Sequence, residues 1–126
     1  GICDAQYRII AWTMNCPGSH NDRTAFNFSG FHKLLDGLPP GYFILGDAAY
    51  PPSDRVLVPY PGTELPNSQD VYSYYQFQCR MAIEQTFRIL VETWGILWRP
   101  MEVHQPRFTQ VVNYVIRLDN FCRNRN

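Results

Sequence analysis

Three acidic residues stand where they could act together in metal chemistry. Asp4 ends a short apolar segment, Asp47 directly follows a longer apolar run, and Glu84 lies in a long stretch with helical periodicity. In open α/β sheets the carboxyl ends of strands border a crevice, because the loops there diverge. Clustered carboxylates repel one another unless a cation lies between them, and their hard oxygen atoms select Mg²⁺ or Mn²⁺. The pattern predicts a divalent-metal site, and paired metal ions of this kind act on phosphodiesters.

The composition limits the classes of protein to which the chain can belong. Its 126 residues suffice for one domain with a modest core. The 11 basic and 11 acidic residues balance, which excludes a polybasic nucleic-acid binder that acts through bulk charge. An aromatic share of 15% argues against disorder, and no apolar stretch approaches the roughly 20 residues needed to cross a membrane. The four cysteines have no C-x-x-C spacing, which excludes a zinc ribbon and favours a reduced compartment.

The first half of the chain predicts short strands and helices between turn residues. The expected elements are strands over Ile2–Asp4 and Tyr7–Met14 joined by a tight turn at Ala5–Gln6, short helices from Arg23 and from Ser29 to Gly37, and a strand over Tyr42–Gly46. The run Tyr42–Gly46 is continuously apolar, which is typical of a strand that is buried on both faces and pairs in parallel. Because Gly1–Cys3 already resembles a strand, we expect the chain to be an N-terminally truncated fragment.

The second half predicts a strand, a proline-rich loop and two helices. We expect a strand over Arg55–Val58, a loop over Pro59–Asn67, a helix from Gln69 to about Trp94 capped by Asn67 or Ser68, and a last helix from Pro106. Apolar residues at helical spacing define the buried stripes, which are Tyr72, Tyr75, Cys79, Ile83, Phe87, Leu90 and Trp94 in the first helix and Phe108, Val111, Val112, Val115 and Leu118 in the second. The order of the elements predicts an α/β fold.

Several segments also carry a family signature. They are Ile2–Ala5, Arg8–Ile9, Pro17–Ser19, Asn21–Asp22, Leu38–Pro39, Tyr42–Pro51, Pro59–Tyr60, Tyr74–Tyr75, Arg80–Phe87, Trp94–Leu97, Arg99–Pro100 and Asn120–Cys122. In this order they resemble the DDE superfamily endonuclease domain of Harbinger-type transposases and the nucleases that hosts have domesticated from them. The resemblance covers nearly the whole chain.

The resemblance implies a ribonuclease H-like fold, the DDE transposase catalytic core, and residues 1–126 as a fragment of a single DDE nuclease domain. It places the three family acids on Asp4, Asp47 and Glu84, the residues selected above by position, as catalytic residues and metal ligands. Two Mg²⁺ or Mn²⁺ ions would there assist hydrolysis or transfer of DNA phosphodiesters. It further implies DNA as the substrate, a nuclear location, no membrane, and a separate protein that supplies DNA binding, since the upstream DNA-binding region of the family is absent.

Departures from the family pattern keep other functions open. The run Phe87–Trp94 lacks the lysine and the second arginine that follow the third acid in the family, and both are candidate phosphate contacts. Near the end, Asp119 stands where the family often has histidine. One alternative is therefore a domesticated or decayed domain that keeps the fold and binds DNA or protein without catalysis. Another is a structural or interaction domain in which the three acids are caps and surface ion pairs.

Each acid has a structural alternative. Asp4 could be a turn residue between two strands, and Asp47 could cap the turn that follows its strand. Glu84 has Arg80 and Arg88 four residues to either side, a spacing that favours ion pairs on a helix.

A few further residues are secondary candidates. Asp22 is expected to cap a helix and is only a secondary candidate for a metal ligand. Tyr74 and Tyr75 could stack on bases, although we expect one of them in the core. Five arginines near the C-terminus could face DNA, although a solvated face is the simpler expectation: Arg99, Arg107, Arg117, Arg123 and Arg125. His20, His32 and His104 show no zinc-site spacing.

Overall fold

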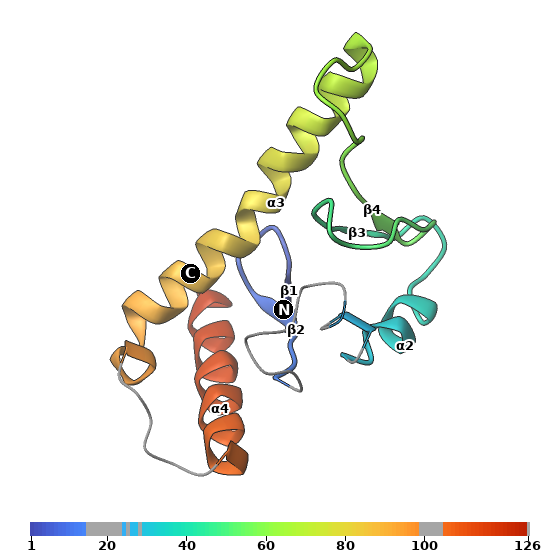
Figure 1. Ribbon diagram of the computed structural model, residues 1–126. Helices are drawn as coiled ribbons and strands as arrows, with labels where there is room; N and C mark the ends of the chain where they lie inside the picture. Colours follow the sequence, from blue (N-terminus) through green and yellow to red (C-terminus); the bar gives the residue numbers. More distant parts are fainter. Residues whose placement is uncertain (15–23, 25, 28, 99–104, 126) are drawn as a thin grey trace. The chain divides into compact units, whose positions relative to one another are not determined.

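The chain folds into helices and short strands that form two compact units. The computed structural model describes residues 1–14, 24, 26, 27, 29–98 and 105–125 (Figure 1). One unit comprises Gly1–Trp12 and Ala82–Asn126, and the other comprises Thr13–Met81. The mixture of strands and helices confirms the α/β prediction. Among the described residues, no helix combines the length and the apolar character needed to span a membrane.

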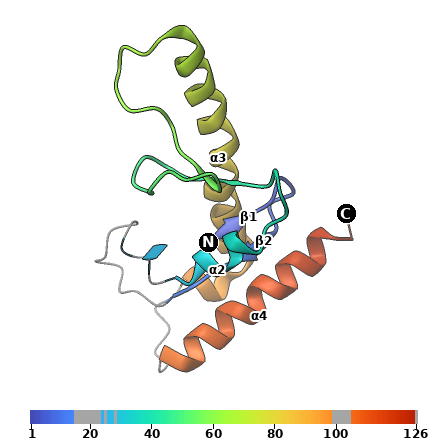
Figure 2. The same cartoon turned by 90° about the vertical axis from the view of Figure 1, so that its right-hand side faces the viewer.

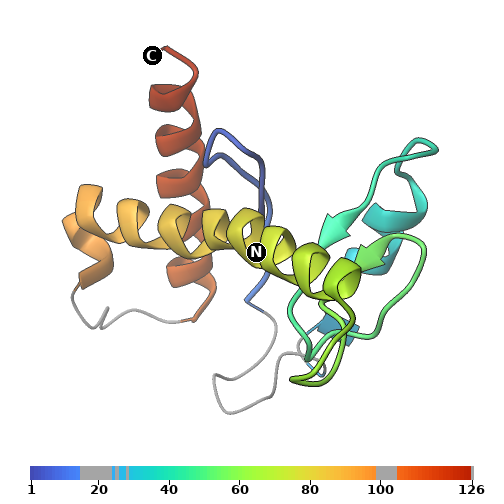
Figure 3. The ribbon, with the colours of Figure 1, turned by 90° about the horizontal axis from the view of Figure 1, so that it is seen from above.

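The first unit is built from a hairpin and helical segments. Strands β1 (Ile2–Cys3) and β2 (Ile9–Ala11) pair antiparallel, as expected. The C-terminal part of α3 (Asn67–Thr93), the 3₁₀ helix η1 (Gly95–Trp98) and α4 (Gln105–Arg123) complete the unit, and Figure 3 shows the hairpin beside α4. The buried core consists of Ile9, Leu90, Val115 and Ile116, with five half-buried apolar residues packed around it: Trp12, Trp94, Leu97, Val111 and Val112.

The hairpin turn is one residue longer than predicted. Tyr7 lies outside the second strand with a φ of 61°, and its amide donates to the carbonyl of Asp4 at 3.1 Å. The amide of Asp4 donates to the carbonyl of Arg8 at 3.0 Å and closes the loop. This is the geometry of a three-residue hairpin loop whose last residue is left-handed, a position that favours glycine or asparagine. The predicted two-residue turn at Ala5–Gln6 was therefore one residue too short. The third loop residue, Tyr7, is left-handed, and a tyrosine does not signal this conformation in the sequence.

The second unit holds a short parallel strand pair. Strands β3 (Ile44–Leu45) and β4 (Val56–Leu57) pair in parallel with Ile44 opposite Val56. Helix α2 (Phe31–Asp36) ends at Gly37 as expected, and Thr24, Phe26 and Asn27 are helical. The buried core consists of Phe26, Leu35 and Val56, and the half-buried residues packed on it are Phe31, Leu38, Ile44, Tyr50 and Val58. The expected irregular loop then leads to the first turn of α3, as Figure 2 shows.

The predicted strand burial was wrong at its first two residues. Tyr42 and Phe43 are 64% and 52% exposed, and the strand itself consists of Ile44 and Leu45, both half-buried. The apolar run is thus longer than the part of it that pairs. The parallel pairing was predicted correctly.

The long helices form where periodicity places them, but their buried faces differ from the prediction. On α3, Leu90 is buried, whereas Tyr75, Cys79 and Phe87 are exposed and the buried polar residues are Gln76 and Thr86. The Thr86 hydroxyl donates to the Ala82 carbonyl at 2.7 Å, which satisfies it within the helix. On α4, Leu118 is 50% exposed and its neighbour Asp119 is buried. The start of α3 also differs, since the carbonyl of Pro66 accepts from the amides of Gln69 and Asp70 in place of the expected side-chain cap.

Candidate functional site

Asp47 lies in a tight turn two residues after the end of β3. Its Oδ1 atom accepts a hydrogen bond from the amide of Ala49 at 2.8 Å, and its carbonyl accepts from the amide of Tyr50 at 3.2 Å. The side chain thus closes the turn in the manner of an Asx turn. Among the described residues, the structure gives the second carboxylate oxygen, Oδ2, no hydrogen-bond partner. Asp47 therefore caps the turn with Oδ1, which was its structural alternative, and keeps Oδ2 available for a ligand.

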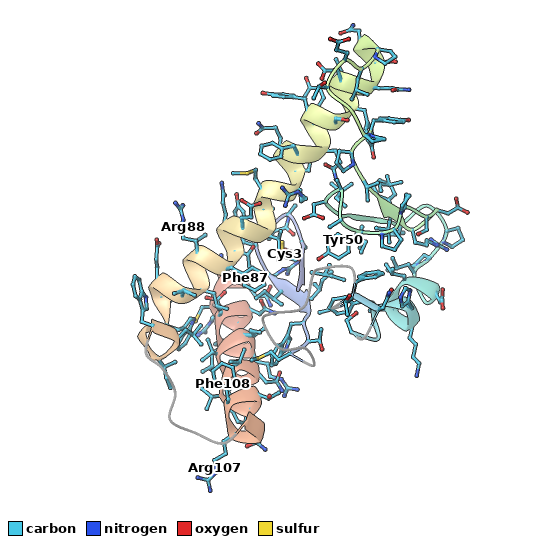
Figure 4. The ribbon with its side chains drawn as sticks, in the orientation of Figure 1. Cys3, Tyr50, Phe87, Arg88, Arg107 and Phe108 are labelled. Carbon is cyan, nitrogen blue, oxygen red and sulfur yellow. The ribbon has the colours of Figure 1, made fainter. Side chains whose placement is uncertain are left out.

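Gly46 and Tyr50 explain the form of the turn that carries Asp47. A Cβ atom on Gly46 would lie 3.1 Å from Cδ2 of Tyr50 and 3.3 Å from its Cβ, so a side chain at this position would crowd the tyrosine and require it to shift. The Tyr50 ring packs edge-on against Phe26, with ring centroids 5.3 Å apart, and Figure 4 shows it in the loop after β3. Close packing of Tyr50 on the backbone of Gly46 therefore fixes the turn that carries Asp47.

An open cavity of about 350 Å³ lies beside the turn that carries Asp47. It is lined by Asp47, Ala48, Ala49, Pro59, Gln76, Phe77 and Arg80, all from the second unit. Gln76 and Arg80 lie four residues apart on α3, which places them on one face of the helix. The guanidinium of Arg80 also lies 5.6 Å from the centre of the Phe77 ring. An acidic and a basic residue thus line the same cavity, whose surface is otherwise mostly apolar.

Asp4 is held much more tightly than Asp47. Its Oδ1 atom accepts from the backbone amides of Gln6 at 2.9 Å and of Arg8 at 3.0 Å. Its Oδ2 atom accepts from Nε of Arg8 at 2.7 Å and forms an ion pair with Nη2 of Arg8 at 2.7 Å. These four contacts use the roughly four acceptor positions of a carboxylate. Asp4 thus has the turn role that was its structural alternative, and a metal ion could bind its oxygens only in place of Arg8.

The environment of Asp4 stabilises its charged form. Burial raises the pKa of Asp4, but the hydrogen bonds from the Arg8 amide and side chain, the hydrogen bond from Gln6 and the charge of Arg8 outweigh it. The pKa is consequently lowered below its ordinary value of 3.8. Asp4 is thus ionised at neutral pH, as a metal ligand must be.

Two asparagines fasten the hairpin that carries Asp4, Asn120 within α4 and Asn124 directly after its end. The side chain of Asn120 accepts from the amide of Ile9 at 3.0 Å and donates to its carbonyl at 2.8 Å. Nη1 of Arg8 donates to Oδ1 of Asn124 at 2.7 Å. The last turn of α4 therefore holds the strand after Asp4, and the residue that follows the helix holds the arginine that pairs with Asp4.

Glu84 is exposed on α3, in the same unit as Asp4. Arg88, one of its two predicted ion-pair partners, has Glu92 at 3.9 Å instead, and it projects outward from the helix in Figure 4. Of the two ion pairs that the spacing allows for Glu84, the structure does not form the one with Arg88. Asp47 belongs to the other unit, so the grouping of all three acids stays a prediction. No group of three His, Cys, Asp or Glu side chains that could hold a metal ion is found within residues 1–14, 24, 26, 27, 29–98 and 105–125.

The secondary candidates differ in their exposure and their contacts in the structure. Tyr74 and Tyr75 pack edge-on with centroids 5.5 Å apart, and both are exposed, so the prediction that one lies in the core was wrong. Arg123 is largely buried and pairs with Asp119 at 2.6 Å, which removes it from the predicted basic face. The other arginines of that group within the described residues are exposed: Arg107, Arg117 and Arg125. Asp22, His20, His104 and Arg99 lie outside the described residues.

Two residues of the site escaped prediction from the sequence. In the sequence, Arg8 stands out only as part of a resembling segment, although an arginine four residues after a turn aspartate is within reach of it. The sequence gives no signal for Gln76, because a glutamine in a helix is ordinarily a surface residue. Only the three-dimensional position of the Gly46 carbonyl, which accepts from Nε2 of Gln76 at 2.6 Å, identifies it.

Comparison with known proteins gives consistent results. The family model for the DDE superfamily endonuclease matches residues 1–120. Protein ALP1-like from Arabidopsis thaliana is 25% identical over an alignment 124 residues long that covers 84% of this chain and 30% of that protein. The chain thus spans less than a third of the length of this relative. No solved structure matches. Since the family match covers nearly the whole chain, the chain belongs to the DDE superfamily endonuclease family.

Proposed function

We propose that the chain is part of a metal-dependent DNA nuclease domain with a ribonuclease H-like fold, derived from a Harbinger-type transposase, in which Asp4, Asp47 and Glu84 act together. The observation that carries the proposal is the state of Asp47. In a member of an endonuclease family, an aspartate at the end of a parallel strand borders a cavity with one carboxylate oxygen unpaired among the described residues. The carboxyl end of a parallel strand is the usual place for a site in an α/β fold.

The three acids offer carboxylate oxygens, the type of ligand atom that suits a hard divalent cation. Carboxylate oxygens are the ligands that Mg²⁺ and Mn²⁺ prefer, and the metal would activate a water or a terminal hydroxyl for attack on phosphorus. Asp47 presents an oxygen for this purpose without rearrangement. Asp4 would have to exchange Arg8 for the cation. Arg80 beside Asp47 would attract the DNA phosphate to the cavity by its charge.

A second function has an observation of its own. The saturation of Asp4 by Arg8 and two backbone amides suits a domesticated or decayed domain, which would bind DNA or protein without cutting. The exposed aromatic residues Tyr74 and Tyr75 give such a domain a surface on which bases could stack. In this case the acids would serve the fold rather than catalysis.

Nicking of supercoiled plasmid DNA in the presence of Mn²⁺ tests the proposal. We expect the chain to nick the plasmid and Asp47→Asn to abolish nicking, because an amide is a much weaker ligand for a hard cation than a carboxylate. Glu64→Gln, a charge-neutralising change at an exposed loop position, serves as the control and should leave nicking unchanged. Unchanged nicking by the Asp47→Asn variant would remove Asp47 from the mechanism. DNA binding by a chain that shows no nicking and no affinity for Mn²⁺ would instead support the second function.

The biological setting follows from the same proposal. A nuclease of this origin would act on DNA in the nucleus, and a separate DNA-binding protein would recruit it to its target. Nuclear fractionation with an antibody to the chain would test the location, and co-purification from the nuclear fraction would test the partner.

A further inference from the structure

Gln76 is a buried amide on an otherwise exposed stretch of helix. Gln76 is 4% exposed, whereas the adjacent Tyr75 and Phe77 are 64% and 47% exposed. Its Nε2 atom donates to the carbonyl of Gly46 at 2.6 Å and, more weakly, to the carbonyl of Leu57 at 3.4 Å. Among the described residues of α3, this side chain therefore joins the helix to the ends of both parallel strands.

The Gly46 carbonyl needs this donor because the strand pair has ended. The amide of Gly46 donates to the Leu57 carbonyl at 2.9 Å, and β3 itself ends at Leu45. Gly46 is buried, and a buried carbonyl without a partner is rare in folded proteins because it has lost its bond to water. The amide of Gln76 replaces the next strand donor, so the peptide between Gly46 and Asp47 is bonded to α3.

We infer that Gln76 is a positioning residue for Asp47. The bond to the Gly46 carbonyl fixes the peptide that carries Asp47 against the helix face that also presents Arg80 to the cavity. The bond between Oδ1 and the Ala49 amide then sets the rotation of the carboxylate. Together these bonds fix the position and the rotation of the Asp47 carboxylate, whose Oδ2 atom has no hydrogen-bond partner among the described residues. The inference rests on the proposed function for its metal, but the constraint on the Asp47 turn exists without one.

Replacement of Gln76 by methionine tests the inference, because methionine has nearly the same length and lacks the donor. Partners that hold a ligand residue typically change metal affinity about 10- to 100-fold when they are removed. We therefore expect Gln76→Met to weaken Mn²⁺ binding, measured by electron paramagnetic resonance, by about tenfold or more. In metal-free protein, we expect faster hydrogen exchange at the Ala49 amide. Gln78→Met, at an exposed position two residues along α3, should change neither quantity.

The outcomes separate this inference from the proposed function. A lower melting temperature of Gln76→Met with unchanged Mn²⁺ affinity and unchanged Ala49 exchange would overturn it, since Gln76 would then be only structural. Equal Mn²⁺ affinity of the wild type and Asp47→Asn would contradict the proposed function, whereas faster Ala49 exchange would still support the positioning role. If Gln76→Met does not fold, Mg²⁺ titration of the wild type decides the matter. The side-chain amide resonance of Gln76 should shift together with that of Ala49, and a fixed Gln76 resonance would overturn the inference.

Discussion

The contacts of Asp4 make its contribution to stability measurable. Asp4→Ala removes two hydrogen bonds from backbone amides and a two-point ion pair with Arg8. Loss of a comparable side-chain cap on backbone amides costs about 0.5–2 kcal/mol. The ion pair is partly exposed, with side-chain exposures of 38% for Arg8 and 21% for Asp4, so its loss adds only about 0.2–1 kcal/mol. We therefore expect Asp4→Ala to lower the free energy of unfolding by about 1–3 kcal/mol.

Asp4→Asn separates the two contributions. Asparagine keeps an oxygen that can accept from the amides of Gln6 and Arg8 but loses the charge, so only the ion-pair part of about 0.2–1 kcal/mol should disappear. Urea unfolding at pH 7, followed by circular dichroism, measures both variants. Asp54→Ala and Asp54→Asn are the controls, because Asp54 is exposed and its side chain makes no hydrogen bond or ion pair within the described part of the chain.

The pH dependence gives the same contact a second test. The pKa of Asp4 is lower in the folded protein than its ordinary value of 3.8, so the folded state binds this proton less readily than the unfolded state. The stabilisation is fully present above about pH 3.8 and is lost as the pH falls through the lower folded pKa. The stability curves of the wild type and Asp4→Asn should therefore converge below pH 3.8. Parallel curves, or an Asp4→Ala variant as stable as Asp54→Ala, would refute the reasoning.

Two further substitutions test the packing around the candidate site and the long helices. Gly46→Ala should destabilise the protein by about 1–3 kcal/mol because its Cβ would lie 3.1 Å from the Tyr50 ring, whereas Gly95→Ala, with open space around it, should not; thermal unfolding of both variants decides this. Asp119→Asn should cost about 1–3 kcal/mol in urea unfolding because it leaves the largely buried Arg123 without an anionic partner, and an unchanged midpoint would contradict the role of this pair.

Local patterns in the sequence predicted most of the secondary structure. Helix α2 ends at the glycine that the pattern indicated, and α4 begins at Gln105, one residue before the expected proline. Parallel pairing of β3 and β4 followed from an apolar run between turn residues. These features depend on residues close to one another in the chain, where helical periodicity, glycine and proline act directly.

The buried faces could not be predicted in the same way, because they depend on distant partners. Asp119 is buried while Leu118 is exposed, since Asp119 accepts from Nε1 of Trp94 at 3.1 Å and pairs with Arg123. Gln76 is buried because a strand carbonyl lacks a donor. Hydropathy assigns both polar residues to the surface, and only their hydrogen-bond partners reverse that assignment.

The same limit applies to the candidate acids. Asp4 and Asp47 use one local device, an aspartate whose Oδ1 accepts from the amide two residues later, at 2.9 Å and 2.8 Å. What differs is Arg8, which occupies the Oδ2 atom of Asp4, while the described residues give that atom of Asp47 no partner. A family signature that contains all three acids is therefore compatible with both a nuclease and a domain that has lost cleavage. The choice between them depends on whether a divalent cation displaces Arg8 from Asp4, because an arginine and a metal ion compete for the same carboxylate oxygen.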